Sequence, residues 1–112
     1  MDIIFKTSKL AKECNDARLA PKKHGDKRAK LLRRRLDELN SAAILEDMRF
    51  LPAPRCHELK QNRKGQLSVD LDHPYRLIFQ PAHDPIPTKP DGGLDWSGVI
   101  SIEILGIEDT HE

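Results

Sequence analysis

The spacing of the apolar residues changes from helical to alternating near the middle of this chain, and that change restricts the fold more than any other feature. Between residues 26 and 43, apolar side chains recur at steps of three and four, at Ala29, Leu32, Leu36, Leu39 and Ala43. This spacing predicts an amphipathic helix with one buried stripe. In 67–71, 75–79 and 100–107 they recur at every second position, which predicts half-buried strands. A helical first half followed by a stranded second half predicts an α+β fold.

Shorter patterns predict further elements in the first half. Ile3 and Phe5, two positions apart and flanked by Asp2 and Lys6, predict a first strand over residues 2–6. Thr7 or Ser8 can cap a helix that follows at once over residues 9–14. Residues 44–51 predict one more helical turn, which ends ahead of two prolines. The first half is therefore mostly helical, with one strand ahead of the helices.

The second half predicts a hairpin and a long loop. A short strand is expected at 56–60 and a polar turn at 61–65. So few residues separate 67–71 from 75–79 that these two strands must pair as an antiparallel hairpin. Residues 81–96 carry four prolines and a glycine pair, which predicts a loop. We therefore expect the 112 residues to form one domain, in which N-terminal helices pack on a mostly antiparallel sheet of about four strands.

Charge is divided unevenly between the two halves of the chain. Residues 1–65 hold 17 of the 19 Lys and Arg and 9 of the 18 acids, which gives a net charge of +8. Residues 66–112 hold the other 2 basic residues and 9 acids, which gives −7. A basic half is suited to phosphate and an acidic half to a basic partner, although charge runs more often serve only to solvate a surface.

Hydropathy and cysteine content indicate the compartment. No apolar run approaches the roughly 20 residues that cross a membrane, and the first five residues carry an acid where an export signal is basic. Cys14 and Cys56 have no spacing typical of a metal site and are too few for a disulfide framework. We expect buried thiols in a cytoplasmic protein that has no membrane partner.

Three places in the sequence offer groups for chemistry on RNA. His57 stands in the short strand ahead of a basic turn, Arg76 lies between apolar residues in a strand, and Asp109 and His111 end the chain. Cleavage of RNA without a metal needs a base that takes the proton from the 2′-hydroxyl and an acid that protonates the departing 5′-oxygen. It also needs a cation for the charge that develops on the phosphoryl oxygens. Histidine is the natural acid or base, because its ordinary pKa is near neutral pH.

Each of these residues also has a structural explanation. A lone strand histidine such as His57 is more often a structural residue, and His111 lies where chain ends commonly fray. Arg76 can face water and pair with Asp70 or Asp72 across the hairpin, where an exposed pair contributes about 0.2–1 kcal/mol. The histidine spacing does not suggest a metal site, and no glycine-rich phosphate loop follows a strand.

The order of several short motifs resembles a known family. Residues 56–65 read Cys-His-Glu-Leu-Lys-Gln-Asn-Arg-Lys-Gly, and residues 75–79 read Tyr-Arg-Leu-Ile-Phe. They resemble the HigB toxins of the RelE-like superfamily, in which a His-x-Leu-Lys segment, an Arg-x-Gly turn and an aromatic-Arg-Ile-x-Phe strand follow in this order. That family ends in an acidic-aromatic-histidine tail, and residues 108–111 stand in its place.

The resemblance implies a RelE-like fold and a ribosome-dependent mRNA endonuclease that uses no metal or other cofactor. Such a toxin enters the ribosomal A site and cuts the mRNA codon displayed there. A cognate HigA-like antitoxin with a helix-turn-helix fold is implied as the partner that keeps the toxin inactive. Operator DNA would be contacted only through that antitoxin.

The resemblance also implies roles for individual residues. His57 and His111 would act in acid–base catalysis or substrate positioning, Asp109 would orient the site, and Arg76 would stabilise the transition state. The residues implied to bind the phosphates of mRNA or ribosomal RNA are Lys60, Arg63, Lys64, Arg33, Arg34 and Arg35.

Two features depart from the family pattern. Thr110 replaces the aromatic residue of the tail, which removes a ring able to stack on a base. The second half is acidic near the expected site, at Asp70, Asp72, Asp84, Asp91 and Asp95.

Two other functions are consistent with the same fold. One is a ParE-like poison of DNA gyrase that acts through protein contacts, and the presence of both His57 and His111 argues against it. The other is an inactive module that binds its antitoxin and adjusts operon repression.

Overall fold

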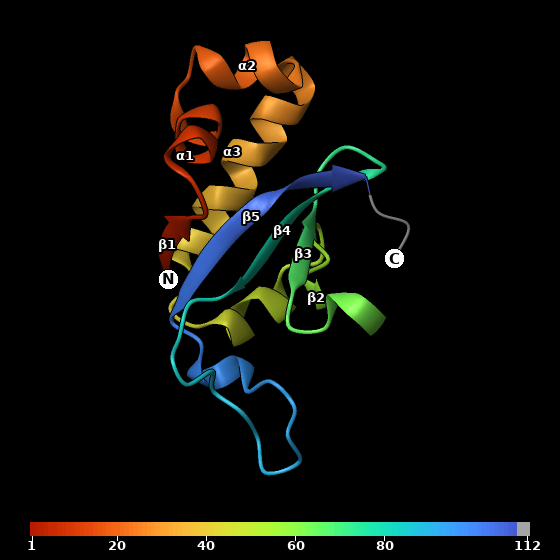
Figure 1. Cartoon of the computed structure of the whole chain (residues 1–112). Helices are drawn as coiled ribbons and strands as arrows, with labels where there is room; N and C mark the ends of the chain where they lie inside the picture. Colours follow the sequence, from red (N-terminus) through yellow and green to blue (C-terminus); the bar gives the residue numbers. More distant parts are fainter. Residues whose placement is uncertain (110–112) are drawn as a thin grey trace.

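The computed structural model describes residues 1–109, in which the helices lie ahead of four of the five strands along the chain (Figure 1). The helices are α1 (Ser8–Asn15), α2 (Leu19–His24) and α3 (Asp26–Ser41). The strands are β1 (Asp2–Phe5), β2 (His57–Glu58), β3 (Leu67–Asp70), β4 (Tyr75–Pro81) and β5 (Ser101–Asp109). Short 3₁₀ turns span Leu45–Phe50, Gln61–Arg63 and Trp96–Gly98. The predicted α+β class is confirmed.

The five strands form one mixed sheet in the order β1-β5-β4-β3-β2. β1 pairs with β5 in parallel, with Ile3 opposite Ile102, and the other described pairs are antiparallel. The predicted count of about four strands is therefore wrong. The parallel pair joins segments from opposite ends of the chain, and no local pattern shows such a pairing.

The hairpin of β3 and β4 is confirmed, with Val69 opposite Leu77. The last strand runs further than predicted, because Asp109 still pairs with Tyr75. The predicted loop also differs at its start, since Pro81 is the last residue of β4. Pro81 lies at the strand end, where its lack of an N–H interrupts little of the ladder.

Local chemistry explains where the helices begin and end. The Thr7 side chain accepts a hydrogen bond from the Leu10 N–H at 3.0 Å and caps α1. α2 was not predicted, because Pro21 and Gly25 are normally helix breakers. Pro21 lies in the first turn of α2, where a missing N–H costs little. Gly25 separates α2 from α3 with a φ of +81°, which glycine adopts without strain.

The main core lies between α3 and one face of the sheet. Leu32, Leu36 and Leu39 are the buried apolar residues of α3. They belong to one cluster with the strand residues Leu67, Val69, Leu77, Phe79, Ile102 and Ile104. Within residues 1–109, no helix is both long enough and apolar enough to span a bilayer.

The opposite side of the sheet carries mostly polar and charged side chains. Strand side chains alternate between faces, and residues opposite each other share a face. We call the side of the sheet away from the helices the outer face. The strand residues that point to it are His57, Ser68, Asp70, Arg76, Ile78 and Glu108. Ile78 is fully buried but lies outside the main core cluster.

Candidate functional site

A row of charged side chains crosses three neighbouring strands on the outer face. Asp70 of β3 is opposite Arg76 of β4, and Arg76 is opposite Glu108 of β5. The Arg76 Nε lies 3.5 Å from the Asp70 Oδ1. Only 11% of the Arg76 side chain is exposed, so this cation is largely shielded from water. The sequence had suggested this cross-hairpin pair as one alternative for Arg76, and the structure contains it.

Two further arginines extend the row at its ends. The Arg55 Nε donates to the Asp70 Oδ2 at 2.6 Å. Arg63 donates through Nη1 and Nη2 to both carboxylate oxygens of Glu108, at 2.6 and 2.7 Å. This bidentate bond lowers the pKa of Glu108 below its ordinary value, since it stabilises the carboxylate. We call these five residues, with Arg76 at the centre, the arginine–carboxylate row; its net charge is positive.

His57 lies beside this row, on the edge strand. It is opposite Ser68, two positions before Asp70, and therefore belongs to the same face. Its Nδ1 is 2.8 Å from the carbonyl oxygen of Arg55. A carbonyl oxygen can only accept, so this contact assigns the proton of the neutral ring to Nδ1. The Nε2 is then the ring atom able to take up a proton.

The predicted RNA-binding residues of the turn after β2 lie next to these groups. Lys60 and Lys64 are exposed at the two ends of the 3₁₀ turn Gln61–Arg63. Arg63 is held more firmly, because its Nε and Nη2 also donate to the Gln66 side chain at 3.0 and 2.8 Å. The turn therefore offers two exposed lysine charges and one guanidinium that hydrogen bonds hold in place.

At the end of β5, Asp109 lies on the other face of the sheet from His57 and Arg76. Asp109 is opposite Tyr75, a residue packed against the main core. By alternation, Asp109 belongs to the helix-side face and not to the face of Arg76. Thr110 and His111 lie outside the described residues. The structure thus brings His57 and Arg76 to one face and does not bring Asp109 there.

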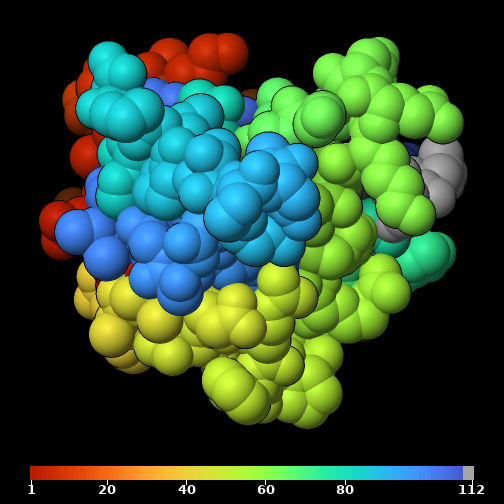
Figure 2. Space-filling model, turned by 90° about the horizontal axis from the view of Figure 1, so that it is seen from below, coloured from red at the N-terminus to blue at the C-terminus, as the bar shows by residue number. Residues whose placement is uncertain are grey.

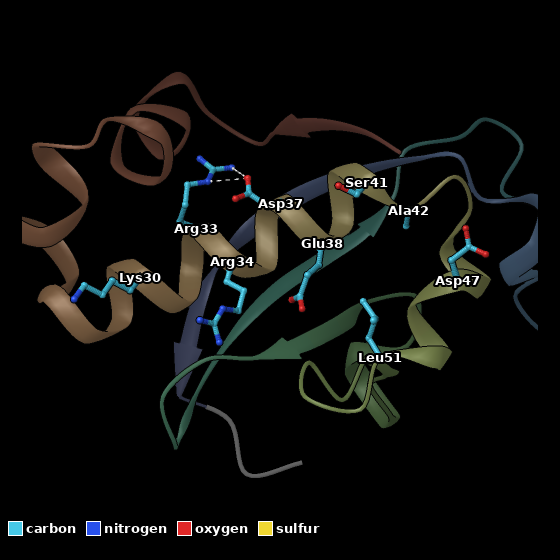
Figure 3. Close-up of a pocket in the computed structure, with 9 residues that line it drawn as sticks. All are labelled: Lys30, Arg33, Arg34, Asp37, Glu38, Ser41, Ala42, Asp47 and Leu51. Carbon is cyan, nitrogen blue, oxygen red and sulfur yellow. Dashed lines mark hydrogen bonds and ion pairs between the residues drawn. The ribbon is translucent and has the colours of Figure 1, made fainter.

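Two of the three predicted α3 arginines border a groove of about 650 Å³ between α3 and the segment that ends at Leu51 (Figure 3). The groove is lined by Lys30, Arg33, Arg34, Asp37, Glu38, Ser41, Ala42, Asp47 and Leu51. Arg33 is paired with Asp37 at 3.0 Å, while the exposed Arg34 points toward the groove. The groove mixes both signs of charge.

The prediction that Arg35 binds RNA needs correction. Its side chain is buried, with only 5% of the residue exposed. It donates to the Asp70 carbonyl oxygen at 2.6 Å and to Glu38 at 2.9 Å. Arg35 therefore anchors α3 to the end of β3, and a buried guanidinium with these partners cannot reach an RNA phosphate.

The loop over residues 82–100 is fastened to the body beside β2. Trp96 is buried, and its Nε1–H donates to the Glu58 carboxylate at 2.9 Å. Arg49, from the 3₁₀ turn Leu45–Phe50, stacks over the Trp96 ring at 3.7 Å. Figure 2 shows this loop, in cyan to blue, lying against the yellow segment that contains the turn. The loop is an ordered part of the surface next to the candidate site.

The cysteines offer no nucleophile to this site. Burial raises the pKa of Cys56, the neighbour of His57, to about 12, and that of Cys14 to about 11. Both thiols are therefore protonated at neutral pH, and the protonated form is a poor nucleophile. Among residues 1–109, no three His, Cys, Asp or Glu side chains gather as ligands for a metal ion.

Two members of the arginine–carboxylate row were not singled out from the sequence. Arg55 precedes the motif around His57, and Glu108 was expected in the tail after the last strand. The strand register shifts between Ile78 and Phe79 along the β4–β5 pair. This bulge changes which residues of β5 face outward, so alternation counted from Ile104 does not find Glu108. The remaining predicted partner of Arg76, Asp72, instead pairs with Arg28 of α3 at 2.8 Å.

Comparisons with known proteins agree with this architecture. A family model described as the RelE-like toxin of the type II toxin–antitoxin system HigB matches residues 5–87. Toxin HigB-1 of Vibrio cholerae is 40% identical over 47 residues, which cover 42% of this chain and 50% of that relative. The match thus spans about half the length of the curated relative. A solved YoeB–YefM complex from Staphylococcus aureus is similar in fold, with a TM-score of 0.53 at 16% identity, over 100% of this chain and 98% of that chain.

Proposed function

Since this chain belongs to the HigB-like family of RelE-like type II toxins, we propose that it is a ribosome-dependent mRNA endonuclease. In this proposal the toxin acts in the cytoplasm, where it cuts mRNA on the ribosome and so inhibits translation. A cognate HigA-like helix-turn-helix antitoxin holds it inactive and carries the contact with operator DNA.

The observation that carries this proposal is the placement of His57 beside a net-positive row of arginines on one face of the sheet. The unprotonated Nε2 of His57 takes the proton of a ribose 2′-hydroxyl. The 2′-oxygen then bonds to the adjacent phosphorus, and the bond from phosphorus to the 5′-oxygen breaks. Arg76 stabilises the charge that develops on the phosphoryl oxygens. The products are a 2′,3′-cyclic phosphate and a 5′-hydroxyl end.

The roles proposed for the other residues are based on the family resemblance. His111 donates the proton to the departing 5′-oxygen, and Asp109 orients the end of the chain. Lys60, Lys64, Arg34, Arg33 and Arg63 supply positive charge for RNA phosphates, and Arg33 and Arg63 are also held by Asp37 and Glu108. Placement of the messenger by the ribosome lowers the entropic part of the barrier, which compensates for a site with few residues.

The test is expression of the toxin without antitoxin, with mapping of the new 5′ ends of cellular transcripts. We expect growth arrest and cuts within translated codons. His57→Asn is the informative variant: its amide can still donate to the Arg55 carbonyl, but no atom replaces Nε2. It should fold and be inactive. Arg76→Ala and removal of residues 109–112 should also relieve toxicity.

Three outcomes would overturn the proposal. Intact transcripts together with a DNA-damage response would indicate a gyrase poison. A normal growth rate with folded toxin present would indicate an inactive antitoxin-binding module. Full toxicity of all three variants would show that the chemistry lies elsewhere on the molecule.

A further inference from the structure

We propose that Glu108 is a positioning residue, which holds Arg63 and flanks Arg76 so that two guanidinium groups keep a set separation at the RNA-cleaving site. This inference rests on the proposed function, and it assigns a role to a carboxylate for which the family resemblance implies none.

The first observation is the way in which Arg63 is held. Its two terminal nitrogens meet both oxygens of Glu108 at 2.6 and 2.7 Å, in a fork-to-fork contact. Such a contact fixes the plane of a guanidinium as well as its distance. On another edge of the same group, Nε and Nη2 donate to Gln66 at 3.0 and 2.8 Å. Arg63 is therefore oriented from two sides and is not a freely rotating surface charge.

The second observation is the position of Glu108 next to Arg76. The two residues are opposite each other on β4 and β5, so their Cβ atoms are about 4.5–5.5 Å apart. On its other side Arg76 meets Asp70. The Arg76 Nη1 is buried and donates no hydrogen bond within residues 1–109. A buried donor of this kind normally has a partner, so the Arg76 guanidinium keeps an unused donor next to Glu108.

The third observation is electrostatic. Glu108 is about 42% exposed and places a negative charge where the proposed substrate is an anion. Arg63 lowers the pKa of Glu108, so the group is a carboxylate at neutral pH and does not serve as the proton donor. Its charge opposes RNA binding, and its two acceptor oxygens are what orient Arg63. Removal of this negative charge should therefore favour RNA binding and slow RNA cleavage.

The experiment uses purified toxin and ribosomes programmed with an mRNA that the wild-type protein cuts. The single-turnover cleavage rate at saturation and the toxin concentration for half-saturation are measured for wild type and Glu108→Gln. Glutamine keeps the size of the side chain, removes its charge, and replaces one acceptor oxygen by an amide donor. We expect the saturated rate to fall about 10-fold or more, while the half-saturating concentration stays equal or falls.

Glu103→Gln is the matched control. Glu103 lies on the same strand and the same face, and it accepts a hydrogen bond from Gln80 at 2.8 Å, away from the arginines. The same change of charge there should leave the saturated rate unchanged. A second test combines Glu108→Gln with Arg63→Lys, which lacks the fork. If Glu108 acts through Arg63, the double variant should be no slower than Arg63→Lys alone.

The outcomes separate this inference from the proposed function. If wild-type toxin cuts no ribosome-bound mRNA, the proposed function fails. If wild type cuts and Glu108→Gln cuts equally fast or faster, the positioning role is overturned, and a faster variant would show that Glu108 masks Arg63. A fall in rate that comes with an equal loss of binding or with unfolding in urea would also overturn it.

Discussion

The two faces of this sheet are built from the same strands but differ in what holds them together. On the helix side, Phe79, Leu77 and Ile104 are fully buried against the leucines of α3. On the outer face, the residues one position away carry the arginine–carboxylate row. Burial of a large apolar side chain contributes about 1.5–3 kcal/mol, whereas the exposed pair of Arg55 with Asp70, at one end of the row, contributes at most about 1 kcal/mol.

This difference teaches how stability and function are divided along one strand. Because neighbouring residues point to opposite faces, a strand such as β4 can supply core and site at once. A substitution on the helix side should act mainly on folding, and one on the outer face mainly on RNA cleavage. Substitutions on the two faces test this division.

The largest effect is expected from Phe79→Ala. Phe79 is fully buried, and its truncation leaves a cavity in the main core. The free energy of unfolding should fall by about 3–5 kcal/mol, measured by urea unfolding followed by circular dichroism. Gln80→Ala, one position along β4 on the outer face, should cost under about 1 kcal/mol. Similar losses for the two variants would contradict the division between the faces.

Arg76→Lys should lower the rate of mRNA cleavage strongly and the stability only slightly. Lysine keeps the positive charge but has no planar fork for a phosphoryl group. We expect the rate of mRNA cleavage on ribosomes to fall about 100-fold, while the free energy of unfolding falls by only about 1 kcal/mol, because lysine keeps the positive charge beside Asp70. Unfolding in urea and primer-extension assays on the same preparations compare the two quantities. Loss of stability without loss of cleavage would make Arg76 a structural residue.

Trp96→Phe tests whether the two faces are also independent at β2. There Glu58 is opposite Leu67 of the core face, and His57 belongs to the outer face. The change removes the hydrogen bond from the indole to Glu58 and should lower the free energy of unfolding by about 1 kcal/mol. Protease cleavage within 82–100 should become faster. The cleavage rate on ribosomes should stay close to that of wild type, and a large drop in it would show that the loop also shapes the site.

Asp72→Asn should give the smallest effect, confined to acid. The hydrogen bond from Arg28 lowers the pKa of Asp72, so the unfolded chain binds its proton more readily than the folded one. The contribution of this pair is therefore fully present above the ordinary titration range of aspartate, near pH 4, and is lost as the pH falls through the lowered pKa.

Urea unfolding of wild type and Asp72→Asn at several pH values between about 7 and 2 measures that contribution. The difference in stability between the two proteins should shrink as the pH falls. Asp91→Asn is the matched control, because the Asp91 side chain is 71% exposed and lies 3.9 Å from Lys89. A constant difference for Asp72→Asn over the whole range would show that the pair does not act through ionisation.

The elements with a local cause could be predicted from the amino-acid sequence alone. Thr7 caps α1 with its own side chain, the leucine stripe defines α3, and two alternating segments separated by a short turn make the hairpin. The motif around His57 and the strand of Arg76 also indicated the family. These features follow from residues within a few positions of each other, because hydrogen bonds and side-chain packing over one or two turns decide them.

Which charged groups meet depends on the packing of distant segments and could not be predicted from local sequence. Arg35 turns inward although Arg33 and Arg34, the two residues before it, are exposed, and Glu108 joins Arg63 from 45 residues away. The pairing of β1 with β5 and the bulge along β4 and β5 set the face on which each residue of β5 lies. Such choices depend on register and on packing between distant segments, and a register change of one residue exchanges the faces of a whole strand.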